Sequence, residues 1–272
     1  MKRLINLTPS KPTRFLLGII PFAILVVVYL IMSEARLAEN AADKLLPSLS
    51  QMGEAIHMYA FSASKRTGEY LFWMDTYSSL KRLLLGISIA ALFGFMVGVL
   101  TGAIPTLNAP FAPLLTIISL VPPMALLPIL FIIFGLEELS KIALIVIGVA
   151  PVIARDLQRS AQEIPHEQII KAQTLGASSW QVLVRIYIPQ LLPRLIHSVR
   201  LSLGAGWLFL IAAEAIAATD GLGYRIFLVR RYMSMDVILP YVIWITFLAF
   251  LLDWLLITIS KKCFTWHYQG AA

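Results

Sequence analysis

The sequence predicts an all-α integral membrane protein with about six transmembrane helices. Hydrophobic residues make up 59% of the 272-residue chain and charged residues only 14%, whereas soluble domains are about a quarter charged. The mean hydropathy is +0.82, and the apolar residues gather into separate runs close to the ~20 residues that a helix needs to cross a bilayer. The net charge of +7 comes from cations that flank these runs. This placement favours an oriented membrane protein over a nucleic-acid binder.

The first apolar run, residues 15–32, is interpreted as a retained anchor helix. The alternative is a cleavable signal peptide, because four Lys/Arg residues lie within residues 1–14. The run is too long for a usual signal sequence, and a small-residue cleavage site is poorly developed. Farther on, residues 45–61 have helix-like apolar spacing within a polar stretch. They predict a surface helix at the membrane interface or packed on the bundle.

The second predicted span covers residues 83–100. It carries small residues four apart, namely Gly86, Ala90, Gly94 and Gly98. Small residues at this spacing let helix backbones approach closely in lipid. The alternative is that membrane helices simply tolerate glycine.

The third predicted span, residues 110–134, is rich in proline. Each proline removes a backbone donor, and such a break is tolerated at membrane depth only where protein or a water-filled cavity covers the freed carbonyls. We therefore expect this helix inside the bundle, beside a transport path. The candidate pathway residues are Pro122, Pro123, Met124, Pro128 and, in the fifth span, Glu214.

The remaining spans are predicted at residues 139–154, 195–217 and 237–259, and six spans place both termini on one side. Four cations precede the first span, and Lys261 and Lys262 follow the last. Segments on that side hold twelve Lys/Arg and three acidic residues, while segments on the other side hold ten of each. The positive-inside rule then predicts cytoplasmic N- and C-termini.

The polar segment 155–194 is the most informative part of the chain. Its pattern predicts two short amphipathic helices joined at Gly176, with Trp180 and Leu183 on one face of the second helix. Pro189 is expected to end that helix before the fifth span. Two interpretations weigh about equally: the helix inserts into a groove on a partner protein, or it lies flat on the lipid surface.

The motifs of this segment resemble those of a known family. Residues Lys171 to Ala177, followed by Ile188-Pro189 and Leu192-Pro193, resemble the EAA loop of bacterial ABC importer permeases, although Lys171 and Gln173 replace Glu and Ala of that motif. Other stretches resemble the nitrate/sulfonate/taurine/bicarbonate permeases: Leu46-Pro47-Ser48, Ser79 to Gly86, Val121 to Pro128, Phe134-Gly135, Glu214 and Gly221 to Tyr224.

This resemblance implies a MetI-like transmembrane domain of a type I ABC importer in the bacterial inner membrane. Residues 1–82 would comprise a cytoplasmic tail, the anchor helix and an extracytoplasmic amphipathic segment. Residues 83–260 would form the core permease domain, with five transmembrane helices and a cytoplasmic coupling loop at 160–193. Residues 261–272 would form a cytoplasmic tail.

The resemblance also implies the partners. Two permease copies would form the pathway for a small oxyanion or organic sulfonate, with two cytoplasmic ATPase subunits and an extracytoplasmic binding protein. The chain has no GxxxxGK[ST] phosphate loop, so we expect nucleotide chemistry on another polypeptide and no enzymatic activity here. The residues expected to couple to the ATPase are Lys171, Ala172, Leu175, Gly176, Ala177, Trp180, Leu183 and Pro189.

Two acids in predicted spans support an alternative function. Glu214 and Asp253 lie in the fifth and sixth spans, where a charge is costly unless it faces the bundle or water. A stand-alone secondary transporter or channel would use them as an ion relay. The structural interpretation satisfies them locally, and Arg200 is a candidate partner for either acid or for lipid headgroups.

The remaining charged groups suggest little chemistry. Arg225, Arg230 and Arg231 predict an outer basic patch after a turn at residues 221–223. The single cysteine and four scattered histidines predict no metal site. We expect no cofactor, no catalytic residue and no nucleic-acid partner.

Overall fold

The computed structural model describes residues 10–40, 43–64 and 68–269. The start of the predicted cytoplasmic tail, residues 1–9, and the last residues of the C-terminal tail, 270–272, lie outside this part. The described part consists of helices: α1 Lys11–Glu39, α2 Leu49–Phe61, α3 Leu71–Ala103, α4 Pro105–Leu120, η2 Pro123–Leu126, α5 Leu127–Phe134, α6 Glu138–Gln162, α7 His166–Thr174, α8 Ser179–Val182, the π-helical turn η3 Leu183–Tyr187, α9 Ile188–Ala217, α10 Leu222–Arg230, α11 Met235–Cys263 and α12 Thr265–Gln269.

Four helices are long and apolar enough to span a membrane, and the bent pair of α4 with η2–α5 makes a fifth if it is counted as one span. The four are α1, α3, the continuous helix Ser179–Ala217 and α11. Five of the six predicted spans fall in these elements. The remaining one, the fourth predicted span at residues 139–154, lies in α6. The 25 residues of this helix extend about 37 Å at 1.5 Å per residue. Its charged residues, including Lys141 and Arg155, keep it out of the apolar set.

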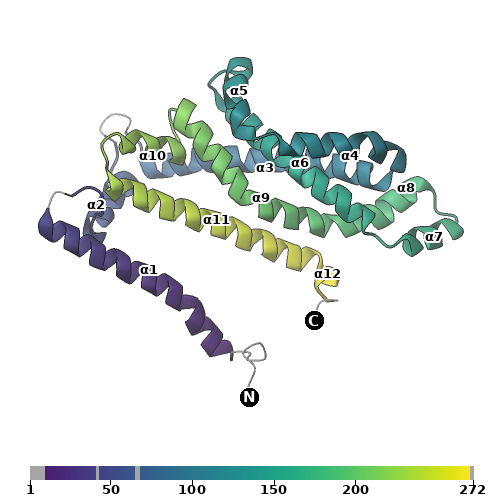
Figure 1. The fold of residues 1–272 in the computed structure, drawn as a ribbon, viewed down its shortest axis with the longest axis horizontal. Coiled ribbons are helices and arrows are strands. Elements are labelled where there is room, and N and C mark those ends of the chain that lie inside the picture. Colours follow the sequence, from purple (N-terminus) through teal and green to yellow (C-terminus); the bar gives the residue numbers. More distant parts are fainter. Residues whose placement is uncertain (1–9, 41–42, 65–67, 270–272) are drawn as a thin grey trace.

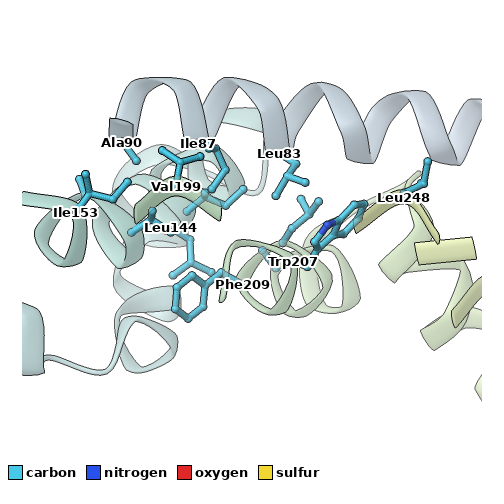
Figure 2. Packing of buried hydrophobic residues seen from close by; sticks show 14 of the residues in the cluster. Leu83, Ile87, Ala90, Leu144, Ile153, Val199, Trp207, Phe209 and Leu248 are labelled. Atoms are coloured by element: carbon cyan, nitrogen blue, oxygen red, sulfur yellow. The ribbon is translucent and has the colours of Figure 1, made fainter. Parts of the chain in front are cut away.

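The core forms where α6 packs between α3 and α9 (Figure 1). Leu144, Ile153 and Leu157 of α6 are fully buried. Figure 2 shows side chains of α3 and α9, among them Leu83 and Trp207, closing around this helix. A helix with charged ends can therefore be buried because its apolar stripe meets two neighbours at once.

The small residues of α3 lie at its contact with α6, as predicted. A Cβ atom added at Gly94 would lie 2.9 Å from Ile153 Cγ2, and one added at Gly98 would lie 2.6 Å from the backbone oxygen of Ala154. Ordinary side chains do not approach this closely. The glycines are therefore required by a close helix contact, which confirms the first interpretation of the spacing.

The third predicted span is not one helix. Helix α4 and the η2–α5 segment meet at an angle of 80°, so the third predicted span, residues 110–134, is a bent pair of helices rather than one continuous helix. Val121 and Pro122 are both extended, with ψ angles of 124° and 113°. Each of them precedes a proline, whose ring clashes with a helical residue before it. The consecutive prolines thus break the chain instead of merely kinking it.

The N-terminal part of the chain meets the bundle through α2, which packs on α3 and α11. Helix α1 stands apart from the other long helices (Figure 1), and its apolar stretch is 0% buried. It is tied through the Tyr29 hydroxyl, which donates to the Pro47 carbonyl at 2.6 Å. Helix α2 begins at Leu49 rather than 45, because Ser48 and Gln51 form a capping box.

Candidate functional site

The predicted coupling segment protrudes as a helix pair at one end of the molecule, opposite α10 (Figure 1). Helix α7 follows Pro165 and ends at a Schellman motif. The Gly176 N–H donates to Gln173 O at 2.9 Å, and the Ala177 N–H donates to Ala172 O at 3.0 Å. Gly176 has a φ of +82°, a left-handed conformation that glycine adopts at little cost. The predicted glycine turn between two helices is confirmed.

The second helix of this pair differs from the prediction. Helix α8 is capped by a box between Ser178 and Gln181, and it continues through the π-helical turn η3 into α9 without stopping. Pro189 lies in the first turn of α9, and Pro193 lies inside it. A widened π turn ahead of Pro189 relieves the clash between its ring and the preceding turn. The prolines therefore do not separate the loop from the fifth span.

Two large apolar side chains of the helix pair face outward. Leu175 is 88% exposed and Trp180 is 70% exposed. The other predicted coupling residues differ in exposure: Lys171 and Gly176 are exposed, whereas Ala172, Ala177, Leu183 and Pro189 are half-buried. Ala172, Ala177 and Leu183 pack against the core. Trp180 and Leu175 are thus the apolar members of this set that remain free to meet a partner.

A cavity of about 450 Å³ separates the helix pair from the junction of α3 and α4. Its lining includes Ala103, Pro105, Ile169, Trp180 and Tyr187. The cavity therefore places α7 and α8 beside the junction of α3 and α4.

At the opposite end, one buried arginine joins three carboxylates, a group we name the outer ion cluster (Arg82, Glu138, Glu214 and Asp220). Arg82 is 2% exposed and Glu214 is fully buried. The guanidinium lies 2.8 Å from Glu214 Oε1, 2.6 Å from Glu138 Oε1 and 2.5 Å from Asp220 Oδ1. Ser79 Oγ also donates to both oxygens of Glu214. These contacts bind the outer ends of α3, α6 and α9 together.

The loop between α9 and α10 completes this cluster. The Gly223 N–H donates to Glu214 Oε2 at 2.9 Å, and Gly221 has a φ of +116°. A Cβ atom at Gly221 would lie 2.5 Å from the Glu214 carboxyl carbon. Burial acts to raise the pKa of Asp220, but hydrogen bonds from Ser78 and Arg82 outweigh it and hold the pKa below its ordinary range. The predicted turn at 221–223 therefore serves to enclose a buried carboxylate.

A second buried pair lies beside this cluster and corrects the predicted basic patch. Arg225 Nε lies 2.8 Å from Asp75 Oδ2, and the Asp75 side chain is 0% exposed. The Gly221 N–H and the Tyr241 hydroxyl also donate to Asp75. Arg225 is buried in this pair and is not a surface cation. It therefore does not belong to an outer patch with Arg230, which lies over the ring of Phe227.

The two intramembrane acids have separate partners. Arg200 pairs with Asp253 through two hydrogen bonds of 2.8 and 2.9 Å, whereas Glu214 belongs to the outer ion cluster. Glu214 is also not brought to the other pathway candidates. Pro122, Met124 and Pro128 lie exposed on the bent segment, with Pro123 half-buried beside them. Glu214 and Asp253, the two acids of the alternative ion-relay hypothesis, are therefore bound by different arginines.

From the sequence alone, Asp75 and Arg82 are placed in a polar segment before the second span and are not expected to be buried in ion pairs. Helix α3 starts at Leu71, earlier than the predicted residue 83. Asp75, Ser79 and Arg82 are spaced four and three apart, so they share one helix face. This polar helix face was the sequence feature that could have predicted the buried ion pairs.

Within the described residues, long helices form a bundle with a bent pair and a protruding helix pair, and several of them are long and apolar enough to span a membrane. The fold is similar to that in the inward-facing conformations of the MetNI methionine ABC transporter, with a TM-score of 0.63 over 73% of this chain and 98% of that chain at 21% identity. A second form of the same transporter gives a TM-score of 0.56. These likenesses establish the fold.

The sequence then establishes the family. Residues 86–263 match the model of the binding-protein-dependent transport system inner membrane component, and the chain belongs to this family. The taurine transport system permease protein TauC of Escherichia coli is 36% identical over 195 residues, covering 72% of this chain and 71% of that protein. The bicarbonate transport system permease protein CmpB of Synechococcus elongatus is 32% identical over 199 residues, covering 72% and 70%.

Proposed function

We propose that this chain is the permease subunit of an ABC importer whose α7–α8 helix pair docks on a cytoplasmic ATPase. Family membership supports the transport role, and the geometry of the helix pair carries the docking role. Two exposed apolar side chains, Leu175 and Trp180, project at the tip of a structure held by a Schellman turn and a capping box. Large exposed apolar groups on a rigid support are typical of protein–protein contacts.

The charge distribution supports a cytoplasmic position for this end. Lys261 and Lys262 lie in the last turn of α11, and the segments assigned to this side carry the larger excess of Lys/Arg. The positive-inside rule then places the helix pair and both termini in the cytoplasm. The outer ion cluster and α10 would face the extracytoplasmic side, where a binding protein delivers its solute.

The proposed solute is a small compound with an oxyanion group. The relatives are a taurine permease, a bicarbonate permease and a putative aliphatic sulfonate permease of Bacillus subtilis, the last 27% identical over 194 residues. Sulfonate and carbonate groups share a compact, delocalised negative charge. Two copies of the chain would enclose the path, and ATP would drive transport by its different affinity for the two states.

The test replaces Trp180 with a charge. Trp180→Asp should abolish ATPase co-purification and reduce solute uptake at least tenfold, because an unpaired carboxylate would be buried at the contact. Tyr232→Asp is the matched control, since Tyr232 is 68% exposed and Trp180 is 70% exposed, and Tyr232 follows α10 at the other end of the molecule. Unchanged co-purification and uptake in Trp180→Asp would refute the docking role.

A second measurement addresses the stand-alone hypothesis. Purified chain in liposomes, without any ATPase, should carry no solute flux above that of empty liposomes. The structure supports this expectation because Glu214 and Asp253 are held by different arginines. An ATP-independent flux that Glu214→Gln abolishes would favour a secondary transporter instead.

A further inference from the structure

Two arginines that have no carboxylate partner among the residues the structure describes line a cavity between α4 and α6. The cavity has a volume of about 300 Å³ and is lined by Ser119, Val152, Arg155, Asp156 and Arg159. It lies toward the end of α6 from which the α7–α8 helix pair continues. Neither the α7–α8 docking role nor the outer ion cluster uses these residues.

The charges in this cavity are unbalanced. Arg155 donates to Ser119 Oγ at 3.3 Å, and within the described ranges neither Arg155 nor Arg159 lies within ion-pairing distance of an acid. The Asp156 carboxylate accepts a hydrogen bond from Ser198 Oγ on α9. Two arginines therefore line the cavity together with one aspartate, whose carboxylate accepts a hydrogen bond from Ser198.

The spacing of the arginines increases this imbalance. Arg155 and Arg159 are four residues apart on one helix, so their side chains are neighbours on one face, and like charges at this spacing repel. An anion between them would remove the repulsion and accept hydrogen bonds from both planar groups. Guanidinium groups match the geometry of sulfonate, carboxylate and phosphate oxygens better than ammonium groups do.

The cavity continues into a second one along α6. The second cavity, of about 210 Å³, is lined by residues of α6 and α9, including Gly148, Ser198 and Ser202. It shares Val152 and Asp156 with the first. From Gly148 to Arg159 the strip runs about 16 Å along the helix at 1.5 Å per residue. Val152 is 48% exposed, so the strip opens to the outside of the single chain.

We propose that Arg155 and Arg159 form an oxyanion-binding site at the inner end of the transport path. Ser119 Oγ accepts a hydrogen bond from Arg155 and donates to Thr116 O, so it positions the Arg155 side chain. This inference rests on the proposed permease function, because a solute that leaves along this strip meets these two groups last. The site would bind the anionic group of the transported solute. The phosphate of an inner-leaflet lipid has the same chemistry and is the competing source.

The test measures anion binding by the purified chain in a neutral detergent. The probe is methanesulfonate, titrated at constant ionic strength against chloride, and the readout is the thermal unfolding midpoint. The wild-type midpoint should rise with methanesulfonate. Arg155→Gln and Arg159→Gln should each weaken binding about tenfold, the loss expected for one charge-assisted hydrogen-bonding partner. Arg155→Lys should retain part of the effect because it keeps the charge.

Arg194→Gln is the matched control. Arg194 is an exposed arginine on α9 that lines a separate cavity, so its loss should leave the methanesulfonate response unchanged. An identical response in wild type and in both Arg155→Gln and Arg159→Gln would overturn the proposal. Stabilisation by a short-chain phosphatidylglycerol but not by methanesulfonate would assign the site to lipid and also overturn it.

A transport assay separates this proposal from the proposed function. In the complete transporter with its ATPase and binding protein, Arg155→Gln should keep ATPase co-purification and lower the rate of taurine uptake at saturating binding protein. Loss of co-purification in the Trp180→Asp variant tests docking alone. Normal uptake by the Arg155→Gln, Arg159→Gln double variant would refute the pathway role while leaving the permease assignment intact.

Discussion

The contact between α3 and α6 makes a sharp prediction for Gly98. A Cβ atom at this position would lie 2.6 Å from the backbone oxygen of Ala154 and 2.8 Å from Leu157 Cβ, whereas ordinary contact begins at 3.4 Å. Gly98→Ala must therefore move the two helices apart by about 0.8 Å, the difference between 3.4 and 2.6 Å. The backbone of Ala154 cannot move aside as the end of a flexible side chain would.

The cost follows from the packing that this movement disturbs. A gap of ~0.5–1 Å forfeits a quarter to a half of each dispersion contact, and Ala154 and Leu157 are 1% and 0% exposed. Overpacking of this kind costs about 1–3 kcal/mol. For a protein of this size we expect the unfolding midpoint in detergent to fall by roughly 2–12 °C.

The assay is thermal unfolding of the solubilised protein, followed by the loss of monodisperse protein on size-exclusion chromatography. Gly204→Ala is the matched control, because a Cβ atom at Gly204 meets nothing within 4 Å. Alanine is favoured over glycine in a helix by about 1 kcal/mol, so this variant should unfold at or above the wild-type midpoint. Equal midpoints for the two variants would refute the reasoning from close helix contact.

Three further predictions concern ion pairs and the glycine turn. Arg82→Gln should destabilise the protein by about 3–5 kcal/mol because it strands a buried carboxylate, and adding Glu214→Gln should restore part of the midpoint; a wild-type midpoint for Arg82→Gln would contradict the cluster. Arg200→Gln should cost roughly 3 kcal/mol, since it leaves the Asp253 carboxylate without its arginine inside the sixth span; an unchanged midpoint would show that this pair does not stabilise the protein. Gly176→Ala should lower the local stability of the turn by about 1–2 kcal/mol at a positive φ and speed amide exchange at the end of α7, while the global midpoint stays unchanged because this exposed turn opens locally; unchanged exchange would count against the strained turn.

The local features of the chain were predictable because neighbouring residues decide them. The Gly176 turn, the Ser178 cap and the glycine spacing of α3 are each encoded within one or two helical turns. The apolar runs likewise place five of the predicted spans in helices of suitable composition. At Pro189 the predicted helix end was wrong, because the helix continues from Ser179 to Ala217 through a π-helical turn.

The partners in the buried ion pairs could not be predicted, because they are residues that lie far apart in the sequence. Arg82 meets Glu214 and Asp220 across more than 130 positions of the chain, and Asp75 meets Arg225 across 150. The hydropathy averaged along the chain assigned the first turns of α3 to a polar segment, because Asp75 and Arg82 are charged. Such an average does not show that distant residues neutralise these charges in the folded protein. The same limit hid the arginine pair of the α4–α6 cavity, because its wall includes Ser119 of α4, which is far from α6 in the sequence.

By itself, the sequence determined which segments are apolar enough to enter a membrane, where the chain turns at Gly176, and which family motifs it carries. Only the tertiary structure decided which charges are buried in pairs and which, like those of Arg155 and Arg159, remain available to a ligand. The physical reason is that helix formation depends on neighbours along the chain, whereas the free energy of a charge depends on the groups that folding brings around it.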